Sequence, residues 1–483
     1  MSNLLKIVWE SVSTRSNSSN YTPNSSSNLS DAGSCSSQVT LSDPAVIMRS
    51  SSAGEFDRIP LDVFMQIVKL LEPKEVARLT SVCKSWKLIV SDNKLWVYYL
   101  QNQHVPWESI FFSEINLRSG YPLQTYSQMQ SFMNIYGLRS QVPGAIIIDG
   151  GSGYCKFGWS KFDSPSGRSA TFLEFGNIES PMSSRLRHFF ATIYNRMQVK
   201  SSTQPIVVSV PICQYDDTEA ARAARRQLKD AIHSALFGMN VPAVCAVSQA
   251  TLALFAAKRT SGIVVNIGFH QTSVVPILHG KIMRKVGVEA VGVGALKLTG
   301  YLKEQMQQRS IHFDSLYTVR SLKENLCYVA LDYEAELCKD TEASYEVPGA
   351  GRFTLKRERF QTGEILFQPR IAGMRAMGLH QAVAHCIDHR HAAELTADES
   401  WFKTIVLAGG TACLPGVAER LEKELRDLLP PSIADGIKVI PPPYGTDSAW
   451  HGAKLISNLS TFPNSWCITK KEFRSKARRS LIW

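Results

Sequence analysis

The pattern of apolar and polar positions along the chain changes twice, near residue 57 and near residue 143. Residues 1–56 are rich in Ser and Asn and contain few large apolar side chains after Trp9. Such a segment buries too little apolar surface to offset the entropy lost on ordering it. We therefore predict that residues 1–56 are disordered.

In residues 57–104 apolar side chains recur every three or four positions, the spacing of amphipathic helices. A first helix is predicted after Pro60, because proline is tolerated in a first helical turn. A second is predicted from Pro73 through Trp86, and a short third one around Trp96. Three such helices bury little surface on their own, so some of their apolar side chains need a partner.

Residues 105–142 contain aromatic side chains and a few prolines, and we predict a packed connector there. Beyond it, short apolar runs alternate with helical stretches such as 219–237, which predicts an α/β domain over residues 143–465. The strand-like runs are AIIID (145–149), PIVVSVP (205–211), GIVVNIG (262–268) and TIVLAGG (404–410). Residues 466–483 are predicted to form a basic C-terminal tail.

Composition and charge indicate in which surroundings the protein is expected to occur. No run approaches the 18 apolar residues of a membrane span, and the N-terminal LLKIVWESV is too short for a signal-peptide core. The ten cysteines are scattered without a C-x-x-C pair, so reduced thiols are expected. The net charge of +11 is partly due to KKEFRSKARRS (470–480), for which nucleic-acid contact, nuclear import and a merely solvated end all stay open.

Strand–glycine–strand patterns occur at 145–159, 262–277 and 404–416. In the first of them, Gly151 and Gly153 leave the backbone N–H groups accessible to a phosphate, and Lys156 adds a positive charge. No Walker P-loop is present. His385 and His389 have a spacing that suits a metal, but no distant second pair of ligands stands out, so we predict no metal site there.

Residues 57–101 resemble an F-box, through IPLDVFMQIVKLL, VCKSW and NKLW taken in that order. The resemblance implies docking on a Skp1-like adaptor of a cullin-based ubiquitin ligase. By position, the docking face would consist of Pro60, Leu61, Phe64, Val82, Cys83 and Trp86. The alternative is a small helical subdomain packed on the rest of the chain.

Beyond residue 143 the chain resembles actin, whose fold is shared with Hsp70 and the sugar kinases. The matching segments are DGGSGYCKFGW (149–159), VPAVCAVSQATLALFAAKRTSGIVV (241–265), LKENLCYVALDYEAE (322–336), GEILFQPRIAG (363–373) and SAWHGAKLISNLSTF (448–462). The implied fold class is α/β and actin-like, preceded by a small all-α F-box and a disordered segment. The chain is thereby identified as an F-box-bearing member of the actin family, of a type found in plants.

The resemblance implies a cleft that holds ATP or ADP with Mg²⁺. The positions kept from the family's nucleotide site are Asp149, Gly151, Ser152, Gly153, Lys156, Gln249, Gly268, Lys323, Glu324, Gly409, Gly410 and Thr411. The departures are Asn266 for an aspartate, Phe269 and His270 for an acid–glycine pair, Ser273 for a water-orienting histidine, and Leu414 and Thr446 near the base. Loss of a metal-side acid and an imidazole predicts little or no hydrolysis. A nucleotide-bound cleft and an empty, structural one both stay open.

The predicted function is a non-catalytic adaptor that docks Skp1 and presents an unknown protein client to the ligase. The alternative is a nuclear actin-related scaffold subunit of a chromatin-associated complex. Either is expected in the nucleus, including the nucleolus, or in the cytoplasm. The segment between Asp149 and the strand at 205–211 is markedly shorter than in actin, where it carries a filament contact, so no filaments are predicted.

Overall fold

The computed structural model describes residues 59–480 except 122, 124–130, 171–179, 213–216, 288 and 390–398. The segment predicted to be disordered, 1–56, lies outside the described residues. The chain divides into two units, Met1–Phe64 and Met65–Trp483. No helix in the described part of the chain is long and apolar enough to cross a membrane.

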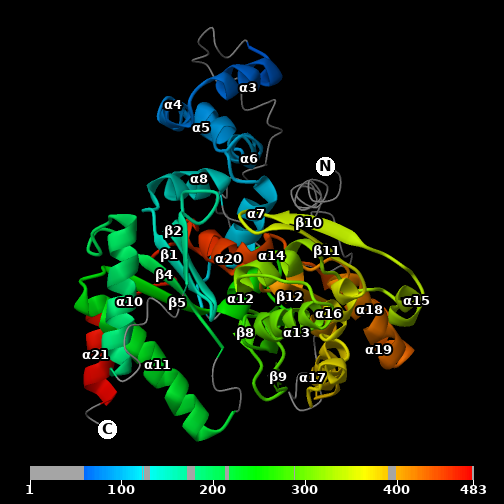
Figure 1. Ribbon diagram of the computed structural model, residues 1–483. Coiled ribbons are helices and arrows are strands. Elements are labelled where there is room, and N and C mark those ends of the chain that lie inside the picture. Colours follow the sequence, from blue (N-terminus) through cyan, green and yellow to red (C-terminus); the bar gives the residue numbers. More distant parts are fainter. Residues whose placement is uncertain are drawn as a thin grey trace, which may run out of the picture. The chain divides into compact units, whose positions relative to one another are not determined.

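The described residues of the F-box segment form four helices, one more than predicted (Figure 1). These are α3 (Leu61–Leu70), α4 (Pro73–Leu79), α5 (Lys84–Val90) and α6 (Asn93–Gln101). The predicted second helix is wrong because it is broken at Cys83, which is extended with φ −157° and ψ 170°. The Cys83 thiol accepts the backbone N–H of Trp86 and so begins α5 as its N-cap.

Helix α6, the short helix predicted around Trp96, carries the buried aromatic residues Trp96 and Tyr99. The Trp96 indole N–H donates to the carbonyl of Val90 at 2.7 Å, and the Tyr99 hydroxyl donates to that of Val68 at 2.6 Å. The Trp96 ring also lies 5.3 Å from that of Tyr136 on α8 (Phe132–Gln141). Both polar ends of the aromatics are therefore satisfied inside the packed helices.

The connector is held to the following domain through Glu114 on α7 (Trp107–Asn116). The buried Glu114 carboxylate accepts the backbone N–H of Ser460 at 2.9 Å and its hydroxyl at 2.6 Å. It also accepts from the Arg139 guanidinium of α8 at 2.9 Å. Helices α7 and α8 are thus held together and to the following domain by hydrogen bonds.

The domain beyond residue 143 contains two large sheets built on the same plan. In each, an antiparallel hairpin is extended by two parallel strands on the side of its first strand. The first sheet has the order β14-β5-β4-β1-β2-β3, and the second the order β13-β12-β6-β7-β8 with β9 paired to β7. Their strands are β1 (Ile146–Gly150), β2 (Tyr154–Trp159), β3 (Gly167–Ala170), β4 (Ile206–Val210), β5 (Ala243–Ser248), β14 (Ile468–Thr469), β6 (Gly262–Ile267), β7 (Thr272–Leu278), β8 (Lys281–Ile282), β9 (Glu289–Val291), β12 (Thr404–Ala408) and β13 (Lys438–Ile440).

Helices α12 (Gln249–Ala256) and α20 (Ser448–Ser457) connect the two sheets. Helix α20 contacts β1 and β4, helix α12 contacts β6 and β12, and the two helices pack on each other. At their crossing, a Cβ on Gly452 would lie 1.8 Å from the Leu252 carbonyl oxygen, so only glycine allows this approach. The turns that end β1 and β6 are thereby held in a fixed relation.

The remaining elements cover the sheets or extend from them (Figure 1). They are α10 (Met182–Met197), α11 (Glu219–Gly238), α13 (Ala295–Gln308), α14 (Leu316–Leu326), α15 (Tyr333–Leu337), α16 (Glu358–Glu364), α17 (Leu379–Asp388), α18 (Val417–Leu428), α19 (Pro431–Ala434), α21 (Lys470–Ser480) and the hairpin of β10 (Ala343–Val347) and β11 (Gly351–Leu355).

The C-terminal segment is not a separate tail. Trp466 is buried, Ile468 and Thr469 pair with β5, and the Phe473 ring stacks on His233 at 5.6 Å. The domain boundary predicted at residue 466 is therefore wrong, because residues 466–473 complete the first sheet and its helical cover. Helix α21 spans the basic stretch 470–480.

Candidate functional site

The first glycine turn joins β1 to β2 and presents Asp149 and Lys156 side by side. Three isoleucines place β1 in the core, so Asp149 at its end is only 1% exposed. The two residues are partners in the antiparallel register, and the Lys156 ammonium lies 3.4 Å from Asp149 Oδ2. A buried carboxylate is thus paired with a cation from its own hairpin.

Asp149 is the centre of a hydrogen-bond chain that crosses from one sheet to the other. Its Oδ1 accepts from the Ser209 hydroxyl of β4 and from Gln249 Nε2 at 2.7 Å. Gln249 Oε1 in turn accepts from Asn266 Nδ2 of β6 at 3.1 Å. An aspartate at position 266 could not donate this bond, so Asn266 fixes the amide orientation of Gln249.

Lys156 has further protein partners on the loop before α20. Its ammonium donates to the Thr446 carbonyl and lies 3.9 Å from Asp447 Oδ1. Asp447 also accepts from Arg168 on β3 at 2.5 Å. The Lys156 charge is therefore engaged by two carboxylates and a carbonyl of the protein itself.

The side chain of Phe269, in the second glycine turn, fills the space beside the first turn. A Cβ on Gly153 would lie only 2.8 Å from Phe269 Cγ, so the ring packs directly on the Gly153 backbone. The Phe269 ring also makes an edge contact with His270 at 4.9 Å. The two turns are therefore separated by a phenyl ring.

Helix α13 holds the second turn in place. The first-turn N–H groups of Ala295 and Leu296 donate to the carbonyls of Gly268 and Phe269, at 3.0 and 2.9 Å. Gly268 itself donates its N–H to the carbonyl of Gln271 at 3.0 Å. Because these amides bond to protein carbonyls, the position of Phe269 is set by backbone hydrogen bonds on both sides.

Lys323 and Glu324 on α14 form hydrogen bonds with partners outside the Asp149 chain. The buried Lys323 ammonium donates to the Thr299 hydroxyl of α13 at 3.1 Å, and burial lowers the pKa of this lysine. Glu324 accepts from Arg320 at 2.8 Å. The Arg320 guanidinium also donates to the Tyr154 hydroxyl and lies 4.6 Å from the centre of that ring. Arg320 thus links α14 to the first turn.

The third glycine turn, after β12, lies against the end of β6. Gly409 has a φ of +90°, and a Cβ on it would lie 2.6 Å from Asn266 Oδ1. A Cβ on Gly410 would meet the Thr446 side chain at 3.6 Å. Thr411 is buried, and its hydroxyl has no hydrogen-bond partner among the residues that the structure describes.

Comparison with known families agrees with this arrangement of paired hairpins. A model of the actin family matches residues 185–481, and an F-box-like model matches residues 56–102. The chain belongs to the actin family. It is 64% identical to Actin-related protein 8 of Arabidopsis thaliana over 484 residues, which cover 99% of this chain and 100% of that protein. Actin-related protein 8 from Oryza sativa subsp. indica and from subsp. japonica are each 62% identical over 434 residues, 89% of this chain and 90% of each relative.

Two predictions are thereby confirmed, the actin-like α/β fold preceded by an F-box and the likeness to an F-box-bearing member of the actin family from plants. The three glycine turns lie close to the Asp149–Gln249 pair. Three groups have roles that sequence reasoning missed: Ser209, Arg320 and the Phe269 ring. Ser209 could have been found, because it is a lone serine in an apolar strand.

The residues present do not fit the Mg²⁺–nucleotide of the actin family in this arrangement. Mg²⁺ is held by oxygen ligands, but Asp149 already accepts from a hydroxyl and an amide and pairs with Lys156. The Gln249 carbonyl oxygen is bonded to Asn266. A phosphate between the two turns would collide with Phe269.

The F-box helices leave several apolar side chains exposed. Leu70 on α3 is 87% exposed, Val82 60% and Leu88 on α5 63%. Of the predicted docking residues, Pro60, Leu61, Val82 and Cys83 are exposed and Trp86 is half-buried. Phe64 is 7% exposed and Val68, one helical turn on, is 1% exposed, so the assignment of Phe64 to a docking face stays a prediction.

Proposed function

We propose that the protein is a non-catalytic adaptor of a cullin-based ubiquitin ligase. Its F-box docks a Skp1-like protein, and its actin-family body recruits a protein client. The observation that carries this proposal is the exposed apolar surface of the F-box segment, represented by Leu70, Val82 and Leu88. The F-box-like match over residues 56–102 supports Skp1 as the kind of partner.

The energetics favour a bound partner on these helices. Full burial of a leucine or valine side chain stabilises an interface by about 1.5 to 3 kcal/mol. Single apolar side chains scattered on a surface need no explanation. Three exposed ones within fewer than 20 residues indicate an interaction surface. Their burial against Skp1 would supply several kcal/mol towards a stable complex.

The actin-family body acts in this proposal as a scaffold and not as an ATPase. The Phe269 ring, the Lys156–Asp149 pair and the Asn266–Gln249 bond take the places that phosphates and Mg²⁺ would need. The body does not hydrolyse ATP, does not depend on a nucleotide and does not form filaments. The adaptor works in the nucleus or the cytoplasm.

The test is co-expression of the full chain with Skp1, followed by size-exclusion chromatography. The decisive variant is Leu70→Asp with Val82→Asp, which places charges on the exposed F-box surface. The matched control is Leu316→Asp with Leu331→Asp, at positions 56% and 55% exposed outside the F-box. We expect co-elution for the wild type and the control, and separate elution for the F-box variant with an unchanged melting temperature.

Separate elution of the wild-type chain and Skp1 would overturn the proposal. In that case, co-purification with chromatin-complex subunits and without cullin would support the alternative, a nuclear scaffold subunit. Equal loss of Skp1 in both variants would show that the interaction is not made through the F-box.

A further inference from the structure

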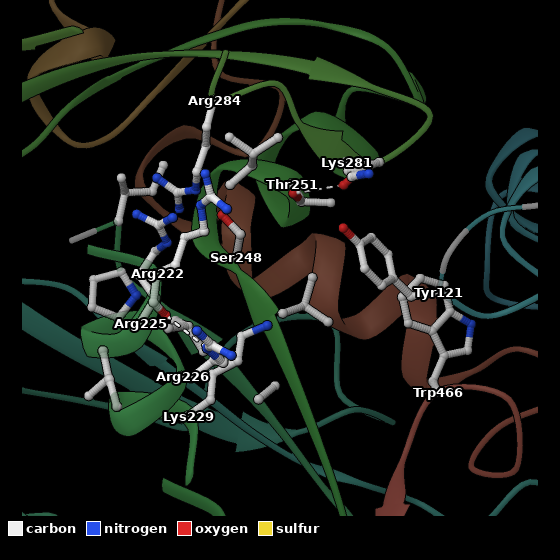
Figure 2. Close-up of a pocket in the computed structure, with 18 of the residues that line it drawn as sticks. Tyr121, Arg222, Arg225, Arg226, Lys229, Ser248, Thr251, Lys281, Arg284 and Trp466 are labelled. Carbon is white, nitrogen blue, oxygen red and sulfur yellow. Dashed lines mark hydrogen bonds between the residues drawn. The ribbon is translucent and has the colours of Figure 1, made fainter. Parts of the chain in front are cut away.

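A large cavity lies apart from the three glycine turns, where α11 faces the segment that follows β8 (Figure 2). Its volume is about 1090 Å³, and its walls come from α11, β5, the start of α12, residues 278–285 and residues 465–468. The cavity therefore lies between elements of the two sheets. This volume slightly exceeds the range of about 300 to 1,000 Å³ that is typical of small-molecule sites.

The charge of the lining is strongly one-sided. Among the described lining residues, seven are arginine or lysine and one, Asp217, is acidic. Asp217 already lies 3.3 Å from Arg222 and 3.6 Å from Arg225. A concave site lined by one sign of charge concentrates counter-ions from solution.

The cations approach the cavity from both sides (Figure 2). Arg222, Arg226 and Lys229 come from α11, whereas Lys281 and Arg284 come from β8 and the residues after it. Burial lowers the pKa of Lys229, and the positive charge of Arg284 lowers it further. The positive charge of Arg284 thus acts unfavourably on Lys229 from the opposite wall, and an anion bound between the two would offset this repulsion.

Polar neutral groups complete the lining. The Ser248 hydroxyl has no hydrogen-bond partner among the described residues, and it lies in the cavity wall. Tyr121 stands on the side of Lys281 in Figure 2, and burial raises the pKa of its hydroxyl while Arg284 counteracts this rise. Hydroxyl donors beside guanidinium groups are the ordinary means of binding phosphate oxygens.

We propose that this cavity is a binding site for a compact, multiply phosphorylated small molecule, either free or as the headgroup of a lipid. A single phosphate could reach only one wall of the cavity, whereas several phosphates on one molecule could reach the cations on both walls. Arginine favours phosphate because its planar fork binds two oxygens at once. The cavity does not involve the F-box, so a test of this proposal does not depend on whether Skp1 binds.

The test is isothermal titration of the full chain with inorganic tripolyphosphate and with inositol hexakisphosphate. The variants are Arg226→Gln with Lys229→Gln, on α11, and Arg284→Gln, on the other side. The matched control is Arg352→Gln with Lys438→Gln, which removes the same charge from exposed strand positions outside the cavity. Melting temperatures of all variants establish that each one folds.

We expect the dissociation constant to rise at least about tenfold in both cavity variants and to change less than about twofold in the control. A tenfold rise corresponds to about 1.4 kcal/mol of binding free energy. Inorganic monophosphate should bind far more weakly than either probe. Absence of binding by the wild type, or equal weakening in cavity and control variants, would overturn the proposal, the latter by showing unspecific charge attraction. Co-sedimentation with phosphoinositide vesicles that is lost in the cavity variants would identify a headgroup as the source, whereas binding of the free probes alone would identify a soluble ligand.

Discussion

Reversal of the second glycine turn to the family pattern should open the cleft that Phe269 now fills. The perturbation is Asn266→Asp with Phe269→Asp and His270→Gly. In the wild type the ring lies 2.8–3.0 Å from the position of a Gly153 Cβ, which leaves no room for a phosphate between the turns. The variant removes that ring and adds two carboxylates on the metal side of the site.

The size of the expected effect follows from mass action. A ligand at about 5 mM with a dissociation constant of about 5 mM stabilises a protein by only about 0.4 kcal/mol, which hardly moves the melting temperature. At a thousandfold lower dissociation constant the gain is about 4.1 kcal/mol, a shift of several degrees. Thermal unfolding with and without Mg²⁺–ATP therefore separates the two cases clearly.

The assay uses the background of Arg226→Gln and Lys229→Gln, so that the triphosphate cannot act through the basic cavity. We expect no shift with Mg²⁺–ATP when Phe269 is present. With the second turn reversed, we expect a shift that EDTA abolishes. A shift of several degrees with Phe269 in place would refute the reasoning, because it would show that the ring moves aside and that the family's ligand binds.

Three further predictions concern stability. Gly452→Ala should destabilise by at least about 3 kcal/mol, because the new methyl group meets a carbonyl of α12 at 1.8 Å; Gly300→Ala, whose new Cβ meets nothing within 4 Å, should be neutral or slightly stabilising in urea unfolding. Glu114→Gln should cost about 2 to 4 kcal/mol, since it leaves a buried guanidinium without its charge partner, whereas Glu108→Gln on the same helix breaks an exposed ion pair and should cost less than about 1 kcal/mol. Burial lowers the pKa of His451 to about 4. Between about pH 6.5 and pH 4 the imidazole is therefore protonated in the unfolded chain but not in the folded one, so the free energy of unfolding decreases as the pH falls through this range. His451→Phe should therefore reduce the loss between pH 7 and pH 5 by about 1 to 2 kcal/mol; an unchanged loss would contradict a buried neutral imidazole.

Local patterns were sufficient to predict the strands that carry the glycine turns and the order of the two domains. Hydrophobic periodicity and helix-breaking residues did not predict the places where one residue changes the backbone conformation. At Cys83, for example, the extended conformation splits one predicted helix into two. The same patterns failed at the C-terminus. A strand of two residues, Ile468 and Thr469, is too short to show a period, and only its pairing with β5 reveals it.

The contacts within the candidate site could likewise not be predicted from local sequence patterns. The sequence identifies Phe269 as a departure from the family, but not that its ring lies on Gly153, since that contact joins hairpins more than 100 residues apart. Likewise, the arginines of 222–229 look like the solvated face of a helix. Their function as a cavity wall depends on Arg284, which the fold brings opposite them.

The central claim is that an F-box on a nucleotide-independent actin-family body docks Skp1. The most direct measurement is an equilibrium titration of purified Skp1 into the purified full chain, with and without Mg²⁺–ATP. We predict a dissociation constant of about 1 μM or lower, about −8 kcal/mol, that is the same in both conditions. No binding in either condition would contradict the claim, and binding that requires the nucleotide would contradict the independence of the body.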